Sequence, residues 1–306
     1  MLHAYREAET ASCLQSKEII FAGDSVTRKL FFEFATSLDK SLHQTTLDPT
    51  KKHSDHDLRT KHGTRLKFAW DPFLNTTYTK SLLSAGKTKS ALQNNSTQAP
   101  VPSMLVLGSG LWYLRYSNAS GGLSAWESNM ESIFDTLVNL PKPADEVVIL
   151  PVEHVVTPKL SAERASTMHP SDIEAMNSDL FHRINPPVAN HGLFGDSPPP
   201  ASTIPVSLPL VFNKMLHESL TEDGLHFSDA LLQVQARILL NLHCNKVMPK
   251  SFPFNKTCCN RYPSPSLPHM AALVLIFLTG PLVALLIYNS SKCRSISLRA
   301  WRLRQL

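Results

Sequence analysis

Short, almost uniformly apolar runs alternate with amphipathic segments along most of this chain. Strands buried on both faces are typically continuous apolar runs, whereas helices that cover a sheet show a 3.6-residue period. The pattern therefore predicts an α/β domain with a parallel sheet between two layers of helices. The expected strands are 17–22, 65–70, 103–108 and 146–151, and the expected helices are 27–38, 122–140, 172–184 and 228–242.

Two polar stretches interrupt this alternation. Residues 38–63 are rich in Lys, His and Asp, and residues 186–209 are rich in Pro and Ser, so both are predicted to be loops. Imidazoles and carboxylates at 51–62 could ligate a divalent metal, but their spacing is irregular and we predict no metal site. Glu153 and His154 follow an expected strand and are interpreted as a strand-end loop.

The tripeptide Gly-Asp-Ser occurs twice, at 23–25 and at 195–197. Three prolines follow Ser197, so no helix can start in that turn, and we interpret Ser197 as a loop residue. Ser25 lies between an expected strand and an expected helix, where its hydroxyl would project above the sheet and helical amides could stabilise an oxyanion. Ser25 is therefore the candidate nucleophile. The alternative is a plain helix cap in which Asp24 bonds the turn.

A nucleophilic serine needs a base held by an acid, and Asp223-Gly-Leu-His226 supplies both. Asp223 could orient the imidazole and favour the imidazolium that forms when His226 takes the Ser25 proton. Ser228 could then cap the following helix. The motif is short, and its alternative is a solvated histidine loop, but the upstream Gly-Asp-Ser turn favours the catalytic interpretation.

With these motifs the chain resembles the SGNH-type, PC-esterase-like acyl-esterase domain of polysaccharide and sialic acid O-acetyltransferases. The resemblance extends over residues 13–262 and implies a flavodoxin-like three-layer SGNH-hydrolase fold with a parallel sheet. Further stretches are similar to the fungal capsule polysaccharide O-acetyltransferase branch: Trp70-Asp-Pro-Phe-Leu-Asn75, Gly108-Ser-Gly-Leu-Trp112, and Asn241-Leu-His-Cys-Asn-Lys246 with Cys258-Cys259.

The resemblance implies an acetyl-serine enzyme with no bound cofactor. Ser25 would take acetyl from acetyl-CoA or a derived acetyl carrier, and His226 would activate a sugar hydroxyl of a glycan or polysaccharide acceptor. Arg28 matches the family's Gly-Asp-Ser-x-x-Arg pattern and would bind the acetyl oxygen or the developing oxyanion. Its alternative is a solvated helix arginine.

The sequence departs from the wider SGNH pattern at Gly108-Ser109-Gly110-Leu111, where those hydrolases carry Gly-x-Asn-Asp. Without the asparagine, we expect the backbone amides of Ser25 and Gly110, helped by Arg28, to bind the oxyanion. Gly108 belongs to the same candidate set. Trp112 is expected either to line the acyl or sugar pocket or to fill the core.

Residues 270–288 carry no charged side chain and would form a helix about 28 Å long, enough to span a bilayer. The alternative is a buried core helix. Five basic residues follow, so the positive-inside rule places residues 289–306 in the cytosol and the domain in the lumen of the Golgi or another secretory membrane. They are Lys292, Arg294, Arg299, Arg302 and Arg304.

The remaining charge is balanced. Of the 30 Lys and Arg residues five follow the apolar run, and the other 25 match the 25 acidic residues. The main domain is therefore expected to be neutral, and no nucleic-acid partner is predicted.

Glycosylation sequons and cysteines fit a lumenal domain. The sequons begin at Asn75, Asn94, Asn95, Asn118 and Asn255. Cys13, Cys244, Cys258 and Cys259 allow three pairings, and a bridge from Cys13 to the Cys258/Cys259 end would join the domain's termini. Reduced, buried cysteines are the alternative.

Residues 1–12 contain no export signal, so we expect an upstream anchor to be missing. A tail anchor that leaves the domain cytosolic is the alternative. The resembled family continues into a multi-span membrane region, whereas a single span is expected here. Two further functions therefore stay open, a lumenal glycan acetyl-esterase and a non-catalytic membrane-anchored remnant of a truncated gene.

Overall fold

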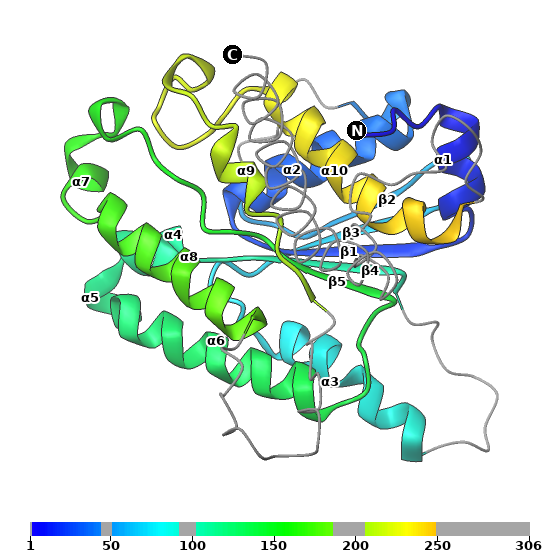
Figure 1. Cartoon of the computed structure of the whole chain (residues 1–306), viewed down its shortest axis with the longest axis horizontal. Coiled ribbons are helices and arrows are strands. Elements are labelled where there is room, and N and C mark those ends of the chain that lie inside the picture. Colours follow the sequence, from blue (N-terminus) through cyan, green and yellow to red (C-terminus); the bar gives the residue numbers. More distant parts are fainter. Residues whose placement is uncertain (1, 44–50, 92–101, 186–205, 249–306) are drawn as a thin grey trace, which may run out of the picture. The chain divides into compact units, whose positions relative to one another are not determined.

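The computed structural model describes residues 2–43, 51–91, 102–185 and 206–248. The chain divides into two compact units, Met1–Ser251 and Phe252–Leu306, and every described residue lies in the first. This unit is an α/β domain built on a six-stranded sheet in the order β2-β3-β1-β4-β5-β6 (Figure 1).

The mostly parallel sheet predicted from the apolar runs is confirmed. β1 (Glu18–Gly23) lies between β3 (Arg65–Trp70) and β4 (Met104–Gly108), and both pair with it in parallel. β5 (Glu146–Ile149) continues the parallel array. The carboxyl ends of these strands therefore meet at one edge of the sheet, which is where loops carry binding and catalytic groups in such folds.

Both edges of the sheet correct the sequence interpretation. β2 (His56–Arg59) pairs antiparallel with β3 inside the stretch 38–63 that was predicted to be a loop. β6 (Val206–Ser207) pairs in parallel with β5 inside the predicted loop 186–209. Edge strands are short and polar because one side of each faces solvent, so they lack the apolar signal of central strands.

Helices cover both faces of the sheet (Figure 1). α1 (Glu7–Leu14), α2 (Ser25–Leu38) and α10 (Asp229–Val247) pack on one face. On the opposite face lie three more long helices, and shorter ones occur in the connections. The former are α3 (Thr77–Ala91), α6 (Gly122–Asn139) and α8 (Pro170–Ile184), and the latter are α4 (Leu111–Arg115), α5 (Ser117–Ser120), α7 (Ala162–Ala165) and α9 (Val211–Lys214).

Successive residues of β1 feed two separate cores. Ile19 and Phe21 pack with α2 and α10, whereas Ile20 and Ala22 pack on the side of α6 and α8. Because side chains alternate along a strand, a strand with helices on both faces must be apolar at every position. This two-sided burial fixes β1, and with it the start of α2, at the centre of the domain.

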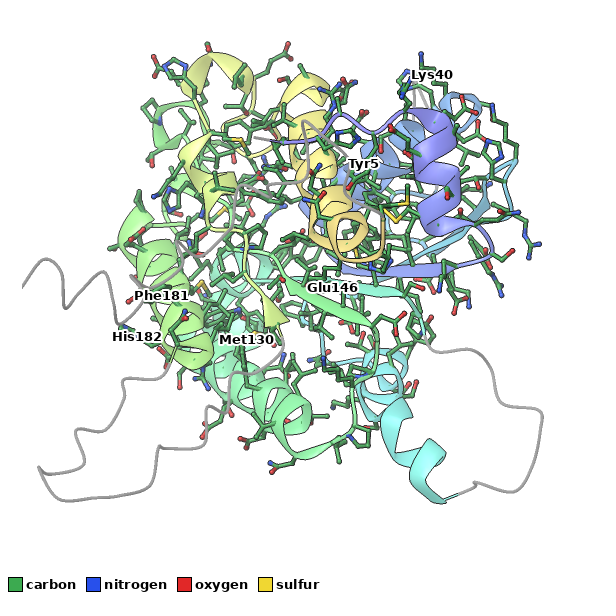
Figure 2. All side chains as sticks on the ribbon, turned by 45° about the vertical axis from the view of Figure 1, so that its right-hand side comes forward. Tyr5, Lys40, Met130, Glu146, Phe181 and His182 are labelled. Atoms are coloured by element: carbon green, nitrogen blue, oxygen red, sulfur yellow. A yellow bond between two sulfur atoms is a disulfide. The ribbon has the colours of Figure 1, made fainter. Side chains whose placement is uncertain are left out.

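A disulfide joins Cys13 of α1 to Cys244 of α10 (Figure 2). The bridge from Cys13 to the Cys258/Cys259 end, considered from the sequence, is therefore wrong for Cys13. The reason is the packing of α1 beside α10, which brings the two cysteines within 5.7 Å between Cα atoms. Both cysteines are buried in the core on that face of the sheet.

No helix in the described ranges is long and apolar enough to cross a bilayer. The predicted span 270–288 and basic tail 289–306 lie outside these ranges. So do the second Gly-Asp-Ser with Ser197, and the sequons at Asn94, Asn95 and Asn255.

Candidate active site

The first Gly-Asp-Ser forms the turn between the central strand β1 and helix α2. Asp24 caps the helix, because its Oδ1 accepts hydrogen bonds from Val26 N at 3.0 Å and Thr27 N at 3.3 Å. Ser25 is the first residue of α2. Since Asp24 already caps the helix, the Ser25 hydroxyl is left to contact a side chain from elsewhere in the chain.

Two glycines allow this turn to sit tightly against the neighbouring strand β4. A Cβ at Gly23 would lie 2.4 Å from the carbonyl oxygen of Gly108, and a Cβ at Gly108 would lie 2.2 Å from Thr27 Oγ1. Because neither glycine has a Cβ, Thr27 can approach Gly108, and its Oγ1 donates a long hydrogen bond of 3.5 Å to Gly108 O. Gly108, a candidate for the oxyanion set, thus has a packing role of its own at this contact.

Ser25, His226 and Asp223 form a continuous chain of hydrogen bonds. Ser25 Oγ lies 2.9 Å from His226 Nε2, and His226 Nδ1 lies 2.7 Å from Asp223 Oδ2. Ser25 and His226 are 201 residues apart in the sequence. The structure therefore brings together the three residues that the two motifs singled out.

The hydrogen-bond partners fix the protonation states in this chain. An ionised carboxylate can only accept, so His226 Nδ1 must carry the proton that it donates to Asp223. The neutral imidazole then presents the lone pair of Nε2 to the Ser25 hydroxyl. This is the tautomer that a general base for the serine needs.

The electrostatics support the same assignment. Burial opposes ionisation of Asp223, but hydrogen bonds from the His226 amide, the His226 ring and the Leu225 amide outweigh it and lower its pKa. For His226, burial lowers the pKa below the ordinary 6.5, although Asp223 opposes the shift. At neutral pH the site thus holds a carboxylate next to a neutral imidazole.

Arg28 follows Ser25 by one helical turn and is buried, with 4% of its surface exposed. It is therefore not the solvated arginine weighed as its alternative. Its Nε and Nη1 atoms have no hydrogen-bond partner within the described residues. Burial lowers the pKa of Arg28, and Asp24 opposes this shift. A buried cation with free donors beside Ser25 is suited to receive negative charge.

Trp112 belongs to an aromatic cluster near Arg28. The Trp112 and Trp70 rings meet edge to face with centroids 5.5 Å apart, and His53 stacks on Trp70 at 4.5 Å. Arg28 lies over Trp70, so the cluster reaches the candidate site through that ring. Trp112 is only half-buried and therefore does not simply fill the core. Its place in the lining of an acyl or sugar pocket stays a prediction.

The loop after β4 lies beside the serine turn, since Gly23 and Gly108 are register partners on adjacent strands. Gly110 has φ +147° and is the N-cap residue immediately before α4, and a Cβ there would lie 2.7 Å from Val152 Cγ2. Within the described residues the amides of Ser25 and Gly110 donate no hydrogen bond to a backbone acceptor. The two amides thus remain candidates for the oxyanion site.

An open groove of about 600 Å³ lies beside His226. It is lined by Lys29 of α2, by Asp229 at the start of α10 and by residues 219–223 and 226–228. This volume is in the range of small-molecule sites. The groove gives a ligand direct access to the imidazole.

A buried carboxyl that the sequence interpretation treated as part of a loop lies close to this site. Glu153 is 8% exposed, and burial together with the charge of Asp24 raises its pKa well above the ordinary value. Burial also raises the pKa of Asp24 to about 6. A single acid after an apolar strand gives no sequence signal for such burial.

The other residues considered from the sequence are placed separately. In the 51–62 stretch His53 stacks on Trp70, His56 packs on Phe32, and Asp57 pairs with Arg65, so these side chains do not converge on one point. The sequon residues Asn75 and Asn118 are both exposed.

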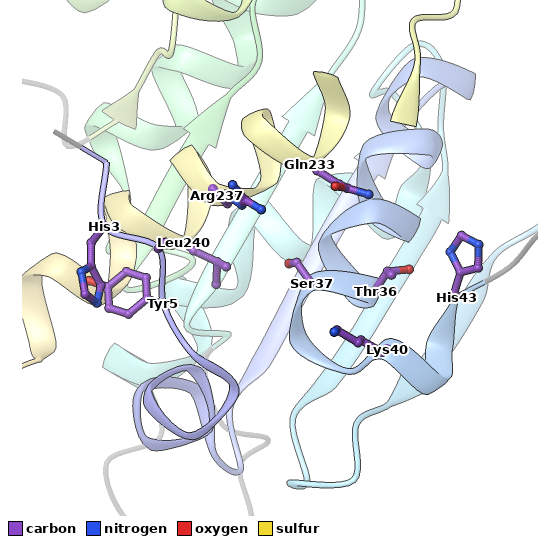
Figure 3. A pocket seen from close by; sticks show the side chains of 10 residues that line it. His3, Tyr5, Thr36, Ser37, Lys40, His43, Gln233, Arg237 and Leu240 are labelled. Carbon is purple, nitrogen blue, oxygen red and sulfur yellow. The ribbon is translucent and has the colours of Figure 1, made fainter. Parts of the chain in front are cut away.

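A second pocket, of about 470 Å³, lies between the N-terminal segment, the end of α2 and α10 (Figure 3). Lys40 flanks it on the α2 side and Arg237 on the α10 side (Figure 3). None of the candidate site residues lines it. This pocket is therefore separate from the Ser25 site.

Comparisons with known proteins place these observations in a family context. No family model matches the chain. A curated relative, the N-acetylneuraminate (7)9-O-acetyltransferase of Danio rerio, is 25% identical over 280 residues, which is 90% of this chain. The chain spans 32% of that relative's length, about a third.

A solved structure also shows a limited likeness. It is a catalytic mutant of an acetylxylan esterase from Geobacillus stearothermophilus, with 12% identity and a TM-score of 0.34 over 74% of this chain and 94% of the esterase. At so low a TM-score we infer nothing from it. The sequence relative, which covers most of the chain, confirms the resemblance carried by the motifs: this chain is similar to the SGNH-type acyl-esterase domain of the sialic acid O-acetyltransferases.

Proposed function

We propose that this chain is a glycan O-acetyltransferase that works through an acetyl-serine intermediate. The observation that carries the proposal is the Ser25–His226–Asp223 hydrogen-bond chain at the turn between β1 and α2. The acetyltransferase relative supports acetyl as the transferred group and a glycan hydroxyl as acceptor. We propose acetyl-CoA or a derived acetyl carrier as the donor. The SGNH-hydrolase form of the fold is part of the same proposal.

In the first half-reaction Ser25 Oγ attacks the acetyl carbonyl carbon while His226 Nε2 takes the hydroxyl proton. The imidazolium is stabilised by Asp223, and the oxyanion of the tetrahedral intermediate is bound by the amides of Ser25 and Gly110 with help from Arg28. Collapse breaks the bond to the donor, and His226 returns the proton to the leaving group. Acetyl-Ser25 remains.

In the second half-reaction a sugar hydroxyl takes the place of the donor. His226 Nε2 removes its proton, the sugar oxygen attacks the acetyl carbon, and the bond to Ser25 Oγ breaks. His226 then protonates Ser25. Water can replace the sugar in this step, so the same geometry supports a glycan acetyl-esterase as the second candidate function.

The proposed setting is a secretory-pathway membrane with the domain in the lumen. The Cys13–Cys244 disulfide supports it, because disulfides persist in oxidising compartments and are rare in the cytosol. The exposed positions of Asn75 and Asn118 are compatible with glycosylation there. The proposal also includes a membrane anchor at residues 270–288, a cytosolic tail after it, and membership of the fungal branch of the family.

Acetate release from a chromogenic acetyl ester tests the nucleophile. The purified full chain is compared with Ser25→Ala, His226→Ala and Ser197→Ala. We expect turnover to fall by about 10³-fold or more in the first two variants, because the residues act as a unit, and to be unchanged in the third. Native turnover equal to that of Ser25→Ala would leave the non-catalytic remnant as the better interpretation.

Transfer and hydrolysis are separated by adding an acceptor. The native chain is incubated with acetyl-CoA and N-acetylneuraminate, and acetylated sugar is quantified by mass spectrometry alongside free acetate. Acetylated sugar that depends on Ser25 supports the transferase. Acetate without acetylated sugar, across sialic acid, hexose and polysaccharide acceptors, supports the esterase.

A further inference from the structure

The segment between β5 and α8 lies directly against the loop that carries Asp223 and His226. Val156 N donates a hydrogen bond of 2.8 Å to Gly224 O, the residue that follows Asp223. Gly224 has φ +75°, and a Cβ there would lie 2.6 Å from Val156 O and 3.0 Å from Leu160 N. The two backbones are therefore in contact, and only glycine fits between them.

A lysine of the same segment fastens the start of the loop. Lys159 Nζ donates to Glu218 O at 2.6 Å and to Thr221 O at 2.8 Å. Thr221 in turn bridges the loop internally, because its hydroxyl donates to His226 O at 2.9 Å and accepts from Gly224 N at 3.1 Å. The position of His226 thus depends on contacts that the segment makes at the start and in the middle of the loop.

The third contact reaches the carboxylate itself. Arg164 of α7 places Nη1 3.3 Å from Asp223 Oδ2, the oxygen that also accepts from His226 Nδ1. The other oxygen, Oδ1, accepts from the amides of Leu225 and His226. Each carboxylate oxygen therefore has two donors, and Arg164 supplies the only one of these four that comes from outside the loop in the described structure.

The short helix that carries Arg164 is itself held in place. Glu163 next to it forms a two-point pair with Arg115 of α4, with Nε to Oε1 at 3.0 Å and Nη2 to Oε2 at 3.1 Å. The Arg164 side chain is 21% exposed and that of Asp223 42%. Arg164 is therefore the more enclosed partner of this pair, as expected of a group that positions the other.

We propose that Arg164 is a positioning residue for the triad, holding Asp223 Oδ2 toward His226 while its charge acts on the imidazole. This inference rests on the proposed function, because it assigns Asp223 and His226 to catalysis. The charged groups facing His226 are Asp223 in the same loop, Lys29 of α2 and Arg164 of α7. Burial is the largest influence on the His226 pKa and lowers it. Asp223 raises the pKa, and the two cations have a smaller lowering effect.

The test compares Arg164→Met, Arg164→Lys and Arg164→Gln with the native chain. The pH dependence of ester turnover is measured, and the His226 pKa is followed separately by NMR of the labelled imidazole. We expect Arg164→Met to reduce kcat about 10-fold and to raise the His226 pKa by a few tenths of a unit. Arg164→Lys should keep the native His226 pKa, and Arg164→Gln should recover part of kcat without recovering that pKa.

The matched control is Arg183→Met, which removes an arginine of similar exposure whose pair to Asp179 lies within α8. Native turnover and native His226 pKa in Arg164→Met would overturn the inference, as would equal effects of Arg183→Met. The NMR measurement needs no turnover, so the two proposals can fail separately. If the native chain is inactive and Arg164→Met still shifts the His226 pKa, the positioning contact is supported and the catalytic function is rejected.

Discussion

The guanidinium carbon of Arg28 lies 5.4 Å from the centre of the Trp70 indole ring. A cation over an aromatic face is attracted by the ring, by about 0.5–2 kcal/mol depending on solvation. This attraction offsets only part of the cost of burying a charge whose Nε and Nη1 have no partner in the described residues. Arg28 is therefore placed at the expense of stability, which points to a role in binding.

Replacing Arg28 should separate stability from activity. In Arg28→Met the buried charge is gone and the side-chain volume is largely kept, so we expect thermal stability equal to or above native. Turnover of an acetyl ester should fall by about 10²-fold, because a donor to the oxyanion is lost. Thermal unfolding and steady-state kinetics measure the two effects. The control is Lys67→Met, which removes a half-buried cation of β3 that pairs with Glu18 at 2.8 Å. Equal loss of turnover there would contradict a specific role for Arg28.

The pH dependence of kcat/KM should report His226 as a base. Because burial lowers its pKa from 6.5, the neutral imidazole persists below that pH, and activity should fall only as pH drops through a midpoint below 6.5. In Asp223→Asn the partner that raises the His226 pKa is lost, so the midpoint should move lower still, with kcat reduced by about 10²–10⁴-fold.

His154 provides the control for this titration. It follows β5 and pairs with Glu174 of α8, at 3.2 Å between Nε2 and Oε2. His154→Gln should leave the midpoint unchanged. A midpoint that moves with His154 and not with Asp223 would contradict the assignment of His226.

Asp24 should make the domain less stable at high pH. Its folded-state pKa of about 6 exceeds the ordinary 3.8, so the cost of ionising it is fully present above pH 6 and disappears below 3.8. Asp24→Asn keeps a good helix cap and removes this cost. We expect the variant to be more stable than native at pH 8, by on the order of 3 kcal/mol, and equal to it near pH 3.5.

A second aspartate gives a control of opposite sign. Hydrogen bonds from Lys61 N and the Ser41 side chain lower the pKa of Asp39 to about 2. Its ionised form stabilises the fold above pH 3.8, and this contribution is lost as pH falls through 2. Asp39→Asn should thus be less stable than native at pH 8. Chemical denaturation at both pH values measures each variant, and the same sign for both would contradict these protonation states.

Gly110 should be irreplaceable for two reasons. Gly110→Ala places a Cβ 2.7 Å from Val152 at φ +147°, so we expect a loss of about 1–3 kcal/mol and a displaced amide that lowers turnover. Gly63→Ala is the matched control, since its φ is +86° but its nearest atom is 3.9 Å away. Gly63→Ala should be strained without losing activity. Full activity in folded Gly110→Ala would remove this amide from the oxyanion site.

The disulfide should contribute measurably to stability. Removing a native bridge typically costs about 2–5 kcal/mol, and more for long loops. The Cys13→Ala/Cys244→Ala double variant should therefore unfold at lower temperature than the native chain, and reductant should lower only the native transition. Equal transitions for the native chain with and without reductant would contradict the bridge.

The central fold could be predicted because its signal is local. β1, β3, β4 and β5 are buried on both faces and therefore nearly uniformly apolar. The edge strand β2 could not be predicted, because its His56 and Asp57 face partly toward solvent. The antiparallel pairing of β2 depends on its contact with β3, which no local pattern encodes.

The candidate site divides in the same way. Ser25, Asp223 and His226 lie in recognisable turns, and the structure brings them into contact, although their role stays a prediction. Arg164 lies in the four-residue helix α7, and no sequence motif marks it. It meets Asp223 only because the segment between β5 and α8 packs against the loop that carries Asp223. Likewise, the pairing of Cys13 with Cys244 follows from helix packing and not from cysteine spacing.

The Cys13–Cys244 bridge also changes the topology of the chain. With a sequence separation of 231 residues, it closes into one covalent ring nearly everything from α1 to α10. Ser25, Asp223 and His226 all lie on that ring. A single proteolytic cut anywhere within it would open the ring without releasing a fragment, so the nucleophile and its base would remain parts of one molecule.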